Sequence, residues 1–149
     1  MSVVASVVSL AAVYFLCCLR FRVDSKVVAV TLSFRGNTKV FNALKDTGNN
    51  LKDPLTGRSV LVIGADIAES VLGLTRQQLE NPIQTLQSNI LPGLRLLPYA
   101  SIGSKNAMLL AMQIKDVKIG GWQGSCLVAL ASQNIIGNRN YQALIGEDV

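Results

Sequence analysis

Hydrophobic and polar residues alternate along much of the chain from Val27 onward, which predicts a mainly β protein. Val27 to Phe34 alternates and is rich in valine, as expected of a strand. Arg35-Gly36-Asn37 is typical of a hairpin turn, and Lys39 to Leu44 resumes the strand pattern. These residues predict a β-hairpin whose second strand runs into Asp46.

The period of two is lost between Ala65 and Asn89. Apolar residues there recur at helix-like spacings, and Gly73 and Asn81-Pro82 interrupt them. One or two short helices are therefore expected as an insertion between strands.

Strand character returns after the helical insertion and persists to residue 131. A second hairpin is expected, with Leu94 to Tyr99 and Ala107 to Ile114 as strands and Ser101 to Asn106 as its flexible tip. Val117 to Ile119 and Ser125 to Ala131 should continue as antiparallel strands around a Gly120-Gly121 turn. Trp122 is expected to pack in the core or at its rim.

The amino terminus differs from the rest of the chain because Met1 to Leu19 carries no charge. At about 1.5 Å per residue, a helix of that length nearly crosses a hydrocarbon core of roughly 30 Å. Arg20, Arg22 and Lys26 follow the apolar run, which places the downstream chain in the cytoplasm. A cleaved signal peptide would show the reverse charge order, and a buried core helix is the other alternative. We expect a transmembrane helix over residues 1–22 and a folded domain over residues 23–149.

The amino-acid composition excludes several classes of catalysis but says less about the fold. The 149 residues suit one domain plus a short appendage, and half of them are hydrophobic. The net charge is +5, but Arg20, Arg22 and Lys26 crowd just after the apolar segment and the other basic residues are dispersed, which argues against a nucleic-acid surface. The chain contains no histidine, which excludes Ser-His-Asp and Cys-His catalysis and removes the commonest zinc ligand. We expect no metal and no cofactor, and the three cysteines suit a reducing compartment.

The remaining candidate chemistry is that of a carboxylate, and it centres on Asp46-Thr47-Gly48. Gly48 permits a tight turn that leaves the Asp46 carboxylate exposed at its tip, and Thr47 can lock the turn through its hydroxyl group. An apolar residue followed by Asp, then Thr or Ser, and then Gly is the sequence signature of aspartic peptidases. Asn49 follows, and then Asp53 to Gly57 forms a predicted turn ahead of the apolar run Ser59 to Ile63.

The whole string D-T-G-N-x-L-x-D-P-x-T-G-x-x-V resembles one family, the membrane-bound sporulation peptidases of endospore-forming bacteria that process the pro-sigma-E factor. The resemblance implies a retropepsin-like aspartic peptidase barrel, preceded by the last helix of a larger membrane region. It also implies a peptidase on the cytoplasmic, mother-cell side of the membrane, which removes the amino-terminal pro-segment of a sigma factor. A protein secreted by the forespore would supply the signal.

Two further elements are expected of an aspartic peptidase. The hairpin tip at Ser101, Ile102 and Gly103 would be the flap that closes over the substrate. A strand ending in an apolar-apolar-Gly triplet would cross behind the catalytic loop. Leu144-Ile145-Gly146 resembles the closing segment of the sporulation peptidases and is preferred, and Ile135-Ile136-Gly137, which resembles that of viral retropepsins, is the alternative.

Peptide hydrolysis by carboxylates requires two of them sharing one proton, whereas this sequence holds one Asp-Thr-Gly. A homodimer with Asp46 from each chain on a two-fold axis is the consequence. Asp53 is expected to have a structural role in its turn. The rival interpretation is a non-catalytic retropepsin-like module that dimerises or binds a partner at the membrane, with Asp46 serving only as a turn residue.

Overall fold

The computed structural model describes residues 27–148 apart from positions 47, 50, 102–103 and 136–139. The predicted membrane segment at residues 1–22 lies outside the described residues. None of the helices within the described residues has the length and apolar character needed to cross a bilayer.

The first hairpin forms where the alternating pattern predicted it. Strand β1 (Val27–Phe34) pairs antiparallel with β2 (Asn37–Lys45), and Phe34 lies opposite Asn37. Arg35 and Gly36 both have positive φ, of 48° and 84°, which gives a two-residue turn whose twist matches that of the strands. Ser33 and Thr38 also bond through their hydroxyl groups at 2.9 Å.

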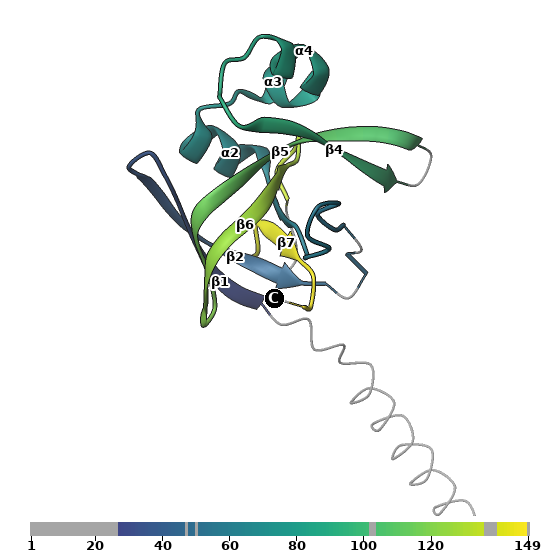
Figure 1. The fold of residues 1–149 in the computed structure, drawn as a ribbon. Coiled ribbons are helices and arrows are strands. Elements are labelled where there is room, and N and C mark those ends of the chain that lie inside the picture. Colours follow the sequence, from purple (N-terminus) through teal and green to yellow (C-terminus); the bar gives the residue numbers. More distant parts are fainter. Residues whose placement is uncertain (1–26, 47, 50, 102–103, 136–139, 149) are drawn as a thin grey trace, which may run out of the picture.

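The sheet closes on itself because β1 pairs with two neighbours. Its strands lie in the order β1, β2, β7, β3, β6, β5, β4, and β1 also pairs antiparallel with β5. Six strands therefore form a barrel, and β4 is added outside it through β5 (Figure 1). The remaining strands are β3 (Leu61–Ile63), β4 (Leu94–Ser101), β5 (Ser104–Ile119), β6 (Trp122–Leu130) and β7 (Ala143–Ile145).

The helical insertion contains three short helices instead of the one or two predicted. They are α2 (Ala65–Leu72), α3 (Arg76–Glu80) and α4 (Pro82–Gln87). Gly73 ends α2 with a φ of 72°, and Thr75 and Gln78 form a capping box that begins α3. The T-x-x-Q spacing of that box was the signal for the extra helix. In Figure 1 the helices gather at one end of the barrel.

Apolar residues fill two regions on opposite faces of β5 and β6. The larger cluster is the barrel interior and includes Leu110, Val128 and Leu130, none more than 1% exposed. The smaller cluster contains Val60, Leu97, Ala111, Leu127 and Ala129. Since successive side chains of a strand point to opposite faces, β6 is buried on both sides at its carboxyl end, which explains its unbroken apolar run.

Candidate active site

The Asp46 loop begins where β2 ends and is held by its own backbone. The amide of Asp46 donates to the carbonyl of Ile145 at 2.9 Å, and the Asp46 carbonyl accepts from the amide of Asn49 at 3.1 Å. The carboxylate Oδ1 accepts from the amide of Gly48 at 2.9 Å. These bonds form a tight turn in which the half-exposed Asp46 carboxylate is oriented by the following residue. Thr47 lies outside the described residues.

Strand β7 crosses directly behind this loop. It is parallel to β2, with Lys45 opposite Ile145, and antiparallel to β3, with Val62 opposite Leu144. Leu144 and Ile145 therefore lie between the strand that leads into Asp46 and the strand that follows its loop. A Cβ atom at Gly146 would overlap Ser59 Oγ and come within 3.0 Å of Ser59 Cβ, so this position has no room for a side chain.

The alternative triplet has a different position. Ile135 lies against the start of α2, where its backbone nitrogen would be 2.9 Å from a Cβ at Gly64. Ile136 and Gly137 lie outside the described residues, so the structure describes only the Leu144 triplet completely.

A groove of about 960 Å³ opens beside the Asp46 loop. Gly48 and Asn49 contribute to it from the loop, and Leu51 and Val62 form part of its apolar lining. The side-chain nitrogen of Asn49 is buried, with no hydrogen-bond partner among the described residues, whereas its Oδ1 accepts from the amide of Leu51 at 3.1 Å. The groove is therefore lined by apolar and polar residues, and the loop reaches it through Gly48 and Asn49, whereas Asp46 is not among the described residues that line it.

The hairpin of β4 and β5 forms another wall of the groove. Pro98, Tyr99 and Ala100 line it from β4, and Leu109 lines it from β5. The strands remain paired to Ser101 and Ser104 near the tip. Of the three predicted flap residues, Ser101 ends β4, and Ile102 and Gly103 lie outside the described residues. The described arms of the hairpin thus line the same groove as the Asp46 loop.

Asp53 is engaged elsewhere and is almost fully buried, at 3% exposed. Its carboxylate accepts from the amide of Leu55 at 3.0 Å and from the hydroxyl of Thr56 at 3.1 Å. Arg95 of β4 lies 3.5 Å from the same carboxylate. Asp53 therefore stabilises its turn and connects it to β4, which fits the structural role expected of it.

A polar cluster connects the chain after Asp46 to the residues after β7. Lys52 Nζ lies 2.6 Å from Asp148 Oδ2 and 2.9 Å from Ser59 Oγ, and Ser59 donates to Asp148 Oδ1. Hydrogen bonds from Lys52 and Ser59 lower the pKa of Asp148 from 3.8 to about 2.

The Asp148→Asn variant is expected to lose about 0.2–1 kcal/mol of unfolding free energy at pH 6, because Asp148 is half-exposed and water screens the pair. The folded-state pKa lies below the unfolded-state pKa, so the ionic contribution is present above about pH 4 and disappears as the pH falls towards 2. Urea unfolding of both proteins at pH 6 and pH 2.5 measures this. An equal difference at both pH values would mean that the contribution is not ionic.

Several groove residues had no local signal in the sequence. Lys52, Tyr99, Gln133 and Leu109 reach the groove from four separate segments. Only the closure of the sheet brings these segments together, so no spacing rule identifies them.

Comparison with known proteins identifies a matching family and two similar proteins. The sequence profile of the family described as Sporulation factor SpoIIGA matches residues 1–149. The sporulation sigma-E factor-processing peptidase of Bacillus subtilis (strain 168) is 26% identical over 131 residues, which cover 79% of this chain and 42% of that protein. The protein of the same name from Priestia megaterium (strain ATCC 12872 / QMB1551) is 28% identical over 100 residues, which cover 63% and 33% of the two chains.

The chain thus spans less than half the length of these two curated relatives. The family profile, in contrast, covers both the described barrel and the residues before it. On that match, the chain belongs to the Sporulation factor SpoIIGA family.

Proposed function

We propose that this chain carries the proteolytic part of a membrane-tethered, retropepsin-like aspartic endopeptidase that works as a homodimer. The observation that carries this proposal is the Asp46 turn, whose carboxylate lies at the end of β2, backed by β7 and beside a groove of about 960 Å³. In this proposal Leu144-Ile145-Gly146 supports the loop. The hairpin tip at Ser101, Ile102 and Gly103 serves as the flap, and Thr47, Gly48 and Asn49 orient the carboxylate.

The proposed dimer follows from the need for a second catalytic carboxylate. Hydrolysis requires a second carboxylate beside Asp46, and Asp53, the next one along the chain, is occupied by Thr56 and Arg95. A second copy related by a two-fold axis would bring its own Asp46 to the first one. Two carboxylates at that distance cannot both be ionised cheaply, so they share one proton.

The shared proton defines the reaction. The ionised carboxylate removes a proton from a water molecule as its oxygen attacks the peptide carbonyl carbon, and the protonated carboxylate donates its proton to the carbonyl oxygen. The resulting tetrahedral diol breaks at the C–N bond as a proton moves to the leaving nitrogen. The products are one carboxylic acid and one amine, and the dyad again holds one proton.

The substrate and the location rest on the relatives and on the sequence. Both relatives are named for processing the sporulation sigma-E factor. By analogy, this chain removes the amino-terminal pro-segment of a sigma factor. Residues 1–22 would be the membrane helix and residues 23–149 the peptidase on the mother-cell side of the membrane, with a secreted protein as its signal. The three basic residues after the apolar run support this orientation.

Co-expression with a pro-sigma factor from the same genome tests the proposal. The unaltered chain should shorten the substrate on a gel, and the Asp46→Ala chain should not. Equal amounts of active and Asp46→Asn chains test the dimer, because random pairing leaves roughly a quarter of the dimers with two Asp46 carboxylates. Activity near one half would instead mean that each chain works alone.

The second candidate function is a non-catalytic module that dimerises or binds a partner at the membrane. It is favoured if the substrate stays intact when the chain is co-expressed in a cell that also makes its signal protein and any remaining membrane helices. Shortening that is equal for the Asp46→Ala and unaltered chains would also reject Asp46 as the catalytic group.

A further inference from the structure

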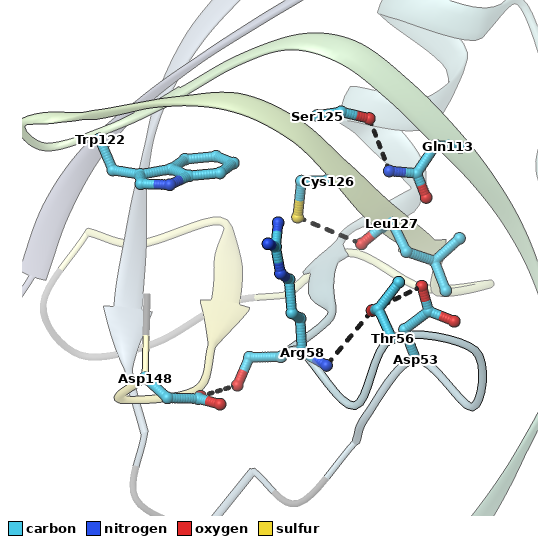
Figure 2. A pocket seen from close by; sticks show the side chains of 10 residues that line it. Asp53, Thr56, Arg58, Gln113, Trp122, Ser125, Cys126, Leu127 and Asp148 are labelled. Carbon is cyan, nitrogen blue, oxygen red and sulfur yellow. Dashed lines mark hydrogen bonds between the residues drawn. The ribbon is translucent and has the colours of Figure 1, made fainter.

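A second pocket, of about 300 Å³, is lined in part by the turn at Asp53 to Gly57 (Figure 2). Its lining includes Arg58 from that turn, Trp122 and Cys126 from β6, and Gln113 from β5. None of its lining residues belongs to the groove beside Asp46. The volume is at the lower end of the range of about 300–1,000 Å³ for ligand sites, so the pocket suits one or two side chains better than a large cofactor.

The charged side chains that line this pocket are Arg58, Asp53 and Asp148, and both carboxylates already have a cationic partner outside the lining. Asp53 lies beside Arg95, and Asp148 is paired with Lys52. The guanidinium group of Arg58 has no hydrogen-bond or ion-pair partner among the described side chains, and Figure 2 shows it pointing between Trp122 and Cys126. Burial raises the pKa of the Cys126 thiol, so at neutral pH this group does not supply a negative charge.

Apolar side chains form part of the wall beside Arg58, which is itself exposed, and most of the other lining residues are polar. Trp122 is half-buried, and Cys126 and Leu127 are buried. Within the described sheet, β6 pairs with β5 along most of its length but with β3 only from Val128 onward. Its other edge, from Trp122 to Leu127, is therefore left without a partner strand. Such an edge accepts an extended peptide through main-chain hydrogen bonds.

We propose that this pocket binds an extended segment of a protein partner that carries an acidic residue next to an apolar one. The carboxylate of the segment pairs with Arg58, the apolar neighbour packs on Trp122, and the backbone of the segment continues the sheet at the free edge of β6. A guanidinium group pairs with a carboxylate through two parallel hydrogen bonds. The site does not depend on proteolysis.

The single tryptophan of the chain makes binding directly measurable. The full chain in detergent micelles is titrated with the blocked peptide acetyl-Val-Leu-Asp-Leu-Val-amide while the fluorescence of Trp122 is recorded. We expect a saturable change, with at least about tenfold weaker binding of the same peptide carrying asparagine in place of aspartate. Arg58→Gln should remove that preference, whereas Arg35→Gln, at the exposed tip of the first hairpin, should keep it.

Each of the other outcomes would overturn the proposal. Equal binding of the two peptides, or an unchanged preference in Arg58→Gln, would mean that Arg58 does not recognise a carboxylate. Sodium butyrate or phosphate binding as tightly as the aspartate peptide would identify a small-anion site instead of a peptide site. Asp46→Asn should bind the peptide as the unaltered chain does, so failure of this proposal and failure of the proposed peptidase activity are distinguishable.

Discussion

On the proposed function, the Asp46→Asn variant is expected to cleave a pro-sigma factor about a thousandfold more slowly than the unaltered chain, within the range of about 10²–10⁴ for general acid–base catalysis. Asparagine has nearly the same shape, and its side-chain oxygen can still accept the bond from the Gly48 amide. It cannot exchange a proton with water or with the second carboxylate. The variant should therefore keep its fold and lose its chemistry, which single-turnover cleavage and thermal unfolding together measure.

Asp116→Asn is the matched control for this experiment. Asp116 is an exposed aspartate on β5, at the irregularity between Ile114 and Val117, and it lines neither the groove nor the second pocket. Its loss should change cleavage less than twofold. If Asp46→Asn failed to fold while Asp116→Asn folded, Asp46 would be a structural turn residue and the non-catalytic interpretation would be preferred.

Ile145→Ala is expected to lower the free energy of unfolding by about 2–5 kcal/mol, as large-to-small changes in a core do. Ile145 is fully buried in β7, and its carbonyl holds the amide of Asp46. The cavity left by the missing atoms would loosen β7 against both β2 and β3. Cleavage should therefore fall by more than the loss of folded protein explains, and chemical denaturation combined with cleavage assays measures both effects.

Ile119→Ala separates stability from support of the loop. Ile119 is almost as buried, at 3% exposed, but it lies at the end of β5 opposite Val30 of β1 and away from the Asp46 loop. The Ile119→Ala substitution should lower the free energy of unfolding by a similar amount, and cleavage per folded molecule should be unchanged. An equal loss of cleavage per folded molecule in both variants would mean that β7 has no special role behind the loop.

The local elements were largely predictable because their causes are local. Valine-rich alternation and the Arg35-Gly36 turn predicted the first hairpin, and the structure confirms it. The turn at Asp53 was predicted from Pro54 and Gly57, and Gly57 has a φ of 70°. The helical insertion lies where the sequence predicted it but contains three helices instead of one or two, because the capping box at Thr75 begins a separate helix, α3.

The arrangement around the candidate site had no such local cause. Both apolar-apolar-Gly triplets have the composition of a buried strand, so the sequence left the choice open. The parallel pairing of β7 with β2 puts Leu144 and Ile145 behind Asp46, and their support of the loop stays a prediction. The ion pair of Lys52 with Asp148 joins residues 96 positions apart, and the pocket around Arg58 depends on the same long-range packing.

The amino-acid sequence determined the chemistry available to this protein: one Asp-Thr-Gly turn, no histidine, and strands whose alternation sets which face is buried. These features depend on residue type and on neighbours along the chain. The tertiary structure decided which strand lies behind Asp46, which segments line its groove, and that the guanidinium group of Arg58, beside the edge of β6, has no hydrogen-bond or ion-pair partner among the described side chains. Those features depend on pairing between distant segments, which closure of the barrel selects and local preference does not.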